Sequence, residues 1–233
     1  MKTFKEEPFI KIDNNYLNHK LRLSLNNNFR QNEKYLFYKR AYDFLYEHNI
    51  DGSYFEFGVH KARTFRMALR ESYIKEFTKE FYAFDSFEGL PYEKNFLKQN
   101  FRFKKNNLIT SVNQFKKDIN PYLKGRKVNI IKGFYKKTLN GSLIKKLRSK
   151  NIKASFICID CDLNESVELA IKFCKPFFMQ GTVLYVDDYY STFKGDPRKG
   201  NVKIINNFFL KNNILAEPYY NVASCGKSFL IYQ

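Results

Sequence analysis

The sequence predicts an α/β protein with a mostly parallel, seven-stranded sheet, helices on both faces and a C-terminal antiparallel hairpin. Short apolar runs alternate with stretches of helical periodicity, which is the pattern of repeated β-α-β units. The last two apolar runs follow each other without a helix between them, and this indicates the hairpin. Several runs end in acidic residues, and sheets of this kind bind ligands outside the carboxyl ends of their strands. The sequence therefore predicts a binding site at those strand ends.

The elements follow in order from an N-terminal extension. Residues 1–32 are polar and rich in asparagine, whereas 33–48 has tyrosine and leucine at helical spacing and ends in a turn at 49–52. We therefore expect an N-terminal helical extension over 1–50 and one main domain over 51–233. Strands are predicted at 54–57, 81–84, 128–132, 155–159, 183–186, 214–222 and 227–232. Helices are predicted at 63–77, 111–119, 139–149, 165–173 and 201–212.

The stretch 86–112 is too long for a simple connection between a strand and a helix. It contains a Gly-Leu-Pro sequence, followed by aromatic residues that alternate with basic ones without a clear period. Long insertions of this kind are often lids or binding loops, so we expect a substrate lid or loop here. A surface excursion with one short helix is the alternative.

The composition indicates a strongly basic protein. There are 41 Lys and Arg against 23 Asp and Glu, which gives a net charge of +18. A field of this sign attracts anions such as nucleic acid, anionic lipid or a phosphorylated substrate. Because the basic residues are spread over the whole chain, we favour a generally basic surface over a nucleic-acid site. Binding of an anionic substrate is kept as an alternative explanation of the charge.

Three further features point to a cytoplasmic protein. No apolar run approaches the roughly 18–20 residues that a membrane-spanning helix needs. The N-terminal segment has no apolar core or cleavage site typical of a signal peptide. The four cysteines form no convincing disulfide framework, so we expect free, mostly buried thiols in a reducing compartment.

Acidic residues follow the first two predicted strands. Glu56 and Gly58 stand where the chain leaves the first strand, and the glycine allows a ligand to approach the backbone closely. Asp85 ends the second strand, where an acid commonly binds ribose hydroxyls; a turn-forming aspartate is the alternative. Thr64, near the start of the following helix, is expected to cap that helix or to donate to a ligand carboxylate.

A second group of acids follows the strands at 155–159 and 183–186. Its members are Asp160, Asp162, Asp187 and Asp188. Neighbouring parallel strands bring such residues together, and clustered carboxylates repel one another unless a cation neutralises them. Hard oxygen ligands suit Mg²⁺ or Ca²⁺, so a metal site is predicted. The alternative is that one or two of these residues cap helices, with Asp162 as the best candidate.

Five motifs in this order resemble the macrocin O-methyltransferases (TylF/MycF-like), a family that uses S-adenosylmethionine and often acts on sugar hydroxyls. The resemblance covers roughly residues 52–210 and implies a Rossmann-like class I methyltransferase fold. One departure is Ala62, which stands where the family usually has glycine. The motifs are Glu56-Phe-Gly-Val-His-Lys-Ala-Arg-Thr64, Phe84-Asp-Ser-Phe-Glu-Gly-Leu-Pro91, Ile131-Lys-Gly-Phe-Tyr-Lys-Lys-Thr-Leu139, Ile159-Asp-Cys-Asp-Leu-Asn-Glu-Ser166 and Val186-Asp-Asp-Tyr189.

The resemblance implies a role for each matching position. The methionine half of the cofactor would lie beside Glu56, Gly58, Val59 and Thr64. Asp85 would hold the ribose, and the adenosine would lie among Ser86, Gly133 and Phe134. Mg²⁺ would be bound by Asp160, Asp187 and Asp188, and Asp160 would also border the cofactor and act as general base.

The sequence thus predicts an O-methyltransferase that uses S-adenosylmethionine and Mg²⁺ and acts on a sugar hydroxyl. A nucleotide-linked sugar or a precursor of a surface polysaccharide is the expected substrate, and no nucleic-acid partner is expected. A small diol or a catechol-like phenol is an alternative acceptor. A non-catalytic nucleic-acid-binding protein on the same fold is the rival outside enzymes. Related enzymes often form dimers or larger homo-oligomers, so the resemblance leaves a homo-oligomer open.

Overall fold

Seven strands form one sheet in the order β3-β2-β1-β4-β5-β7-β6. The computed structural model describes residues 19–78, 80–90, 108–191 and 193–232, with side chains from residue 29 onward. Neighbouring strands from β3 to β5 are parallel, and β7 is antiparallel to both β5 and β6, which confirms the predicted hairpin. The strands are β1 (Ser53–Phe57), β2 (Glu80–Asp85), β3 (Lys127–Lys132), β4 (Ala154–Ile159), β5 (Thr182–Val186), β6 (Leu215–Val222) and β7 (Gly226–Tyr232).

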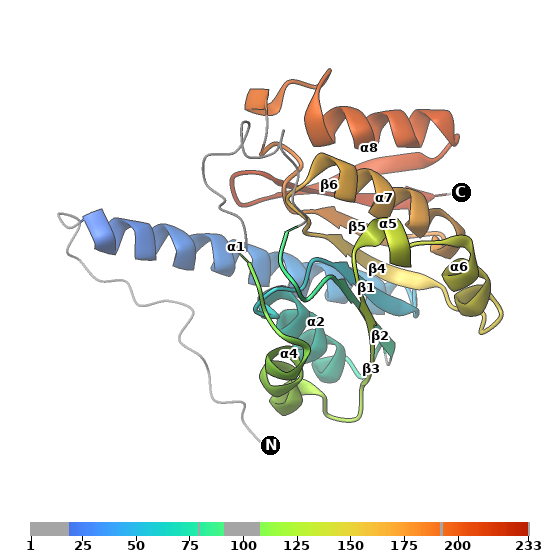
Figure 1. Ribbon diagram of the computed structural model, residues 1–233, viewed down its shortest axis with the longest axis horizontal. Helices are drawn as coiled ribbons and strands as arrows, with labels where there is room; N and C mark the ends of the chain where they lie inside the picture. The colour runs from blue at the N-terminus through green and yellow to red at the C-terminus, as the bar shows by residue number, and fades with distance from the viewer. Residues whose placement is uncertain (1–18, 79, 91–107, 192, 233) are drawn as a thin grey trace.

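Helices cover both faces of this sheet (Figure 1). Apolar side chains of α1, α2 and α4 form one core on the first face, and those of α5 to α8 form a second core on the opposite face. The helices are α1 (His19–Glu47), α2 (Arg63–Ile74), α4 (Val112–Ile119), α5 (Tyr135–Thr138), α6 (Gly141–Arg148), α7 (Asn164–Cys174) and α8 (Gly200–Lys211), with short 3₁₀ turns at Asn120–Tyr122, Lys175–Phe177 and Phe193–Gly195.

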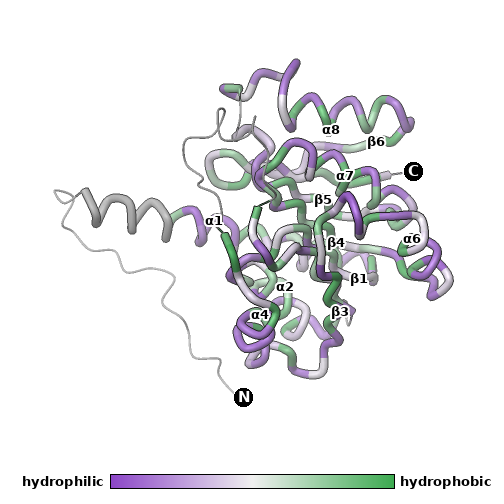
Figure 2. Tube along the Cα trace, viewed as in Figure 1, coloured by the Kyte–Doolittle hydropathy of each residue, from purple (hydrophilic) through white to green (hydrophobic). Residues whose placement is uncertain are grey.

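The central strands have the composition expected of a sheet that is buried on both faces. Parallel strands covered on both faces are expected to be continuously apolar, and β4 and β5 are buried at every position. Figure 2 shows hydrophobic segments in the central strands and more hydrophilic ones along the outer helices. Among the described residues, no helix is both long and apolar enough to cross a bilayer.

Two helices differ from the sequence prediction. Helix α1 begins at His19 rather than near residue 33, and its first part extends away from the sheet (Figure 1). The polar, asparagine-rich stretch before residue 33 lacks the apolar periodicity on which the prediction relied. The helix predicted at 139–149 is confirmed as α6, which Asn140 caps by accepting a hydrogen bond from the Leu143 amide at 3.0 Å, whereas the short helix α5 before it was not predicted.

The predicted lid at 86–112 lies largely outside the described residues, which resume at 108. The described flanks are ordered by local contacts. Ser111 caps α4 by accepting a hydrogen bond from the Gln114 amide at 3.1 Å, so the helix predicted at 111–119 is confirmed. The division between 1–50 and 51–233 stays a prediction, although the second half of α1 contributes buried residues to the first core.

Candidate active site

A cavity lies at the carboxyl ends of β1, β2 and β4, where the sequence predicts a ligand site. Its lining includes five of the residues proposed for the cofactor: Gly58, Asp85, Ser86, Phe134 and Asp160. The other four, Glu56, Val59, Thr64 and Gly133, are not among the residues that line it. The structure therefore brings the two groups of acids to one cavity, with Asp85 and Asp160 both in its wall.

Gly58 allows the ends of β1 and β4 to approach each other. It has a positive φ of 87°, and a Cβ atom at this position would lie 2.0 Å from the carbonyl oxygen of Asp160. The Asp160 amide donates to the carbonyl of Phe57 at 2.9 Å and continues the ladder between the two strands. Close packing of the two backbones therefore requires glycine at this position, and the same packing fixes the backbone position of Asp160.

Asp85 holds the loop that follows β1. Its Oδ2 accepts hydrogen bonds from the amides of Val59 at 2.8 Å and His60 at 3.3 Å. Its Oδ1 accepts one from the amide of Phe87 at 2.7 Å, which is the turn-forming interaction considered as the alternative to ribose binding. The carboxylate is therefore held in place by three backbone donors, while the side chain still lines the cavity.

Glu56 is fully buried on the opposite side of this loop. Its two oxygens accept hydrogen bonds from the hydroxyl of Tyr54 and from that of Thr64, the latter at 2.8 Å. Burial raises the pKa of Glu56 to about 8, against the effect of these two donors. Thr64 does not cap α2, because the N-cap is Ala62 and the threonine hydroxyl donates to Glu56.

The loops after β2 and β3 complete this side of the cavity. The Ser86 hydroxyl donates to the carbonyl of Gly89 at 2.7 Å and so closes a tight turn. Gly133 has a φ of 134° and donates its amide to the carbonyl of Asp85 at 2.9 Å. This contact joins the end of β3 to β2 and leaves Phe134 in the cavity wall.

Asp160, Asp187 and Asp188 form a carboxylate cluster beside the cavity. One oxygen from each lies within 4.8 Å of the others. Strands β4 and β5 are adjacent and in register, and the Asp187 amide donates to the carbonyl of Ile159 at 3.0 Å, so the predicted convergence is confirmed. The capping alternative for Asp162 is wrong, since the N-cap of α7 is Leu163 and has no side-chain cap.

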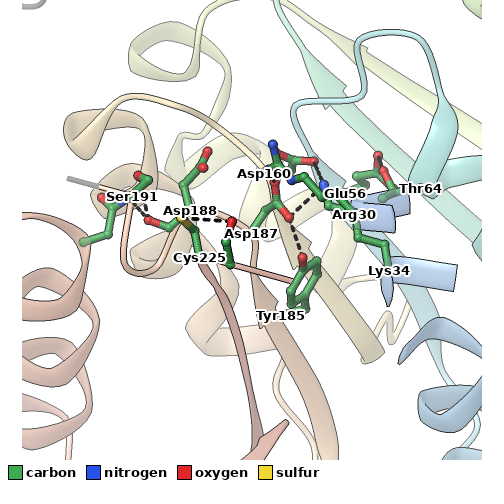
Figure 3. A network of polar contacts seen from close by, with 12 residues as sticks. Arg30, Lys34, Glu56, Thr64, Asp160, Tyr185, Asp187, Asp188, Ser191 and Cys225 are labelled. Carbon is green, nitrogen blue, oxygen red and sulfur yellow. Dashed lines mark hydrogen bonds and ion pairs between the residues drawn. The ribbon is translucent and has the colours of Figure 1, made fainter. Parts of the chain in front are cut away.

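Two basic side chains from α1 contact this cluster, and the sequence analysis missed both. The Lys34 ammonium lies 2.7 Å from Asp187 Oδ1 and 3.4 Å from Asp160 Oδ2. The Arg30 guanidinium lies 2.5 Å from Asp187 Oδ2, and the Tyr185 hydroxyl also donates to Asp187. Figure 3 shows Arg30 and Lys34 pointing from α1 toward Asp160 and Asp187. No local sequence signal indicates these contacts, because Arg30 lies 157 positions from Asp187 and Lys34 lies 126 positions from Asp160.

The charges perturb the acids in opposite directions. Burial and the neighbouring Asp187 raise the pKa values of Asp160 and Asp188 above their ordinary range. Burial alone would also raise the pKa of Asp187, but Lys34 and Arg30 outweigh it and hold that pKa below its usual value. Burial and Asp160 raise the pKa of Asp162 to about 7. Asp187 is thus held in its charged form, whereas burial favours the protonated forms of the other three acids.

The donor set fits a hard divalent cation. Three carboxylates with converging oxygens are the ligands that Mg²⁺ or Ca²⁺ prefers, and these three acids outnumber the two cations that contact them. Asp187 differs from the other two, because Lys34, Arg30 and Tyr185 already use its oxygens. These residues fit Mg²⁺, with α1 bringing two competing cations to the same carboxylate.

Comparison with protein families decides what kind of enzyme this is. The model of the macrocin-O-methyltransferase (TylF) family matches residues 35–226, most of the chain. The chain belongs to the macrocin-O-methyltransferase (TylF) family. It is an S-adenosylmethionine-dependent O-methyltransferase, as the sequence motifs predicted. A sequence search of curated proteins finds no match.

Solved structures share the fold of this TylF-family chain. The O-methyltransferase NovP has a TM-score of 0.63 at 18% identity, over 85% of this chain and 79% of that one. The calicheamicin methyltransferase CalS11 has a TM-score of 0.67 at 13% identity, over 84% and 77%. An apo structure of CalS11, described as a TDP-rhamnose 3'-O-methyltransferase, has a TM-score of 0.59 at 14% identity, over 93% and 88%. The predicted Rossmann-like methyltransferase fold is confirmed.

Proposed function

We propose that this enzyme methylates a sugar hydroxyl, with Mg²⁺ as a second cofactor and a nucleotide-linked sugar or a surface-polysaccharide precursor as acceptor. One observation carries the proposal: a single cavity extends from Asp85 to Asp160, and the carboxylate cluster adjoins it at the Asp160 end. A methyl donor held near Asp85 and an acceptor hydroxyl held near Asp160 would therefore share one space.

The residues around Asp85 support a cofactor site. Asp85 would bind the ribose hydroxyls with the lone pairs that its three backbone donors leave, and Ser86 and Phe134 would lie beside the adenosine. Gly58 presents backbone to the cavity without a side chain, as the methionine half of the cofactor requires. Behind it, Glu56 and Thr64 would fix the shape of the loop rather than contact the cofactor directly, since they bond to each other.

Val59 and Gly133 would act through their backbone. Val59 ties the loop after β1 to Asp85 by its amide, and Gly133 ties the loop after β3 to the same residue. Both contacts keep the cavity wall in one arrangement before the cofactor arrives. This preorganisation lowers the cost of binding, because fewer groups need to be ordered when the complex forms.

The residues around Asp160 support the acid–base chemistry. Asp160, Asp187 and Asp188 would hold Mg²⁺, which when bound supplies a Lewis acid beside the acceptor hydroxyl. Asp160 lines the cavity, and its carboxylate would accept the hydroxyl proton as the new carbon–oxygen bond forms.

The sugar is supported by the similar proteins and by charge. CalS11, which shares the fold, is described as a TDP-rhamnose 3'-O-methyltransferase. A net charge of +18 would attract an acceptor that carries a diphosphate, such as a nucleotide-linked sugar.

Calorimetric titration with S-adenosylhomocysteine, with and without Mg²⁺, tests the cofactor site. We expect micromolar binding in both conditions, and absence of binding would contradict the assignment around Asp85. A methyl-transfer assay with nucleotide sugars, catechols and small diols then tests the acceptor. Turnover of nucleotide sugars but not catechols supports the proposal, and the reverse result would replace the sugar by a phenol or diol.

A further inference from the structure

The carboxylate cluster is already partly neutralised by the protein itself. Asp187 is 2% exposed, and both of its oxygens contact cations from α1, Oδ1 with Lys34 and Oδ2 with Arg30. Lys34 is 5% exposed and also reaches Asp160. Burying a lysine is costly unless the charge is paired, so the position of Lys34 is specified by the acids that surround it.

These two cations lie outside the part of the chain that the family shares. The match to the family begins at residue 35, whereas Arg30 and Lys34 precede it by five positions and one. They are one helical turn apart, so both lie on the same face of α1. The three acids lie within the matched range, and the two cations lie before it.

We propose that Lys34 and Arg30 are the resting counterions of the cluster, and that a divalent cation binds in competition with them for Asp187. The inference rests on the metal site of the proposed function and adds residues that set its affinity. Both partners of Asp187 carry a positive charge within 2.7 Å of its oxygens, where a metal ion would be repelled by them.

The packing of α1 allows the exchange. The helix is anchored from Phe37 onward, where Phe37, Tyr38, Ala41 and Tyr42 are buried in the first core. The turn that carries Arg30 is less buried, since the Arg30 side chain is 42% exposed and Phe29 is 64% exposed. Arg30 and Lys34 can therefore leave the cluster while the rest of the helix stays in place.

Competition is reciprocal, and this makes the proposal testable from both sides. If the cations of α1 weaken metal binding, the metal must weaken the attachment of that turn by the same factor. Removing Lys34 should tighten the metal site, and adding metal should loosen the start of α1.

The first experiment is calorimetric titration of MgCl₂ into metal-free protein. We expect Lys34→Met to bind Mg²⁺ at least about tenfold more tightly than the unmodified chain, because the ammonium no longer opposes the ion at short range. Lys34→Arg keeps the charge and should stay much closer to the unmodified affinity. Lys39→Met is the matched control, since Lys39 lies on the same helix but pairs with the exposed Asp43, and its variant should bind Mg²⁺ unchanged.

Each other outcome has a definite meaning. Equal or weaker affinity in Lys34→Met overturns the proposal, because Lys34 would then be neutral toward the metal or help to build its site. Binding by Lys34→Met alone supports it. If neither protein binds Mg²⁺, both this proposal and the magnesium part of the proposed function fail, while S-adenosylhomocysteine binding in the same samples reports separately on the cofactor site.

A second measurement does not depend on the variant folding. Amide hydrogen exchange of the unmodified protein is followed by mass spectrometry with and without MgCl₂. We expect Mg²⁺ to speed exchange at 30–36 in α1 and to leave 38–45 unchanged, because only the first stretch loses its partners. Unchanged or slower exchange at 30–36 in protein saturated with Mg²⁺ overturns the proposal.

Discussion

The two sides of the cavity neutralise their acids in different ways. On the side of β1 and β2, Glu56 and Asp85 accept hydrogen bonds from hydroxyls and backbone amides, all of which are uncharged. On the side of β4 and β5, Asp187 is paired with an ammonium and a guanidinium. The first side is held by neutral donors that stay in place, whereas the second is held by charges that another cation can replace.

This difference separates a rigid half of the site from an exchangeable one. Neutral donors on a loop fix its geometry and leave a preformed surface for the cofactor. Charged partners can be displaced, because a metal ion or a proton competes directly for the same carboxylate. We therefore expect substitutions on the two sides to change different quantities, and four predictions test this from the largest effect to the smallest.

The largest effect is expected for Asp160→Asn. The amide cannot accept the acceptor's proton as a base, so turnover should fall at least about 100-fold. S-adenosylhomocysteine affinity should change little, because the cofactor is proposed to be held mainly from the side of Asp85. Asp118→Asn, at a partly exposed acid on α4 that is bonded to Gln114, serves as the control for purification and assay. Unchanged turnover in Asp160→Asn would remove the base from the proposal.

Among substitutions of the acids in this site, Asp187→Asn is expected to lower the free energy of unfolding most. It leaves the buried Lys34 ammonium without its nearest partner, which typically costs about 3 kcal/mol. Asp43→Asn is the matched control, because Asp43 also pairs with two lysines, Lys39 at 3.0 Å and Lys75 at 2.7 Å, but is 36% exposed. That loss should stay below about 1 kcal/mol. Urea unfolding of metal-free protein at pH 7 measures the loss of stability in both variants. Equal losses would contradict the proposed difference between the buried ion pair of Asp187 and the more exposed pairs of Asp43.

The rigid side is also the side that the sequence describes best. The acids there and most of their partners lie within one β-α-β unit, and the alternation of apolar strands with a helix predicts that unit directly. Convergence of Asp160 with Asp187 could likewise be predicted, because adjacent parallel strands end at the same level. The parallel strands β1 to β5 were predicted to within one residue at each end, because strands of a covered parallel sheet are short apolar runs.

The counterions could not be predicted, because their contacts are long-range. Arg30 meets an acid 157 positions away, and Lys34 meets one 126 positions away. Residues before 33 have no apolar periodicity, so neither the helix start nor the direction of its side chains follows from pattern. The role of Thr64 was missed for a related reason: a hydroxyl near a helix start predicts a cap, whereas here the buried Glu56 accepts its hydrogen bond.

Stability should depend on pH through Glu56. Its pKa is about 8 in the folded protein and near 4.5 when unfolded, so between these values only the folded state holds the proton. Stability contributed by the protonated form is therefore lost as pH rises from 5 to 8. Relative to the unmodified chain, Glu56→Gln should gain on the order of 1 kcal/mol for each pH unit in this window.

Chemical unfolding at pH 5, 6, 7 and 8 measures the effect as a difference between the two proteins. Other acids with raised pKa values, such as Asp162, titrate in both proteins, so their contributions to stability cancel in the difference. A difference that does not change with pH would mean that Glu56 is ionised throughout, and the two sides of the cavity would then be more alike than the contacts indicate.

The smallest effect is expected for Thr64, which tests the neutral donors themselves. Thr64→Val keeps the shape of the side chain but removes the donor to Glu56 Oε1, and it should cost about 1 kcal/mol. Thr64→Ser retains the hydroxyl and should cost less. S-adenosylhomocysteine binding should weaken in Thr64→Val and largely recover in Thr64→Ser, because the threonine acts by holding Glu56 behind the cofactor loop. If Thr64→Ser loses binding while Thr64→Val keeps it, the methyl group of Thr64 packs the loop and its hydroxyl has no part in it.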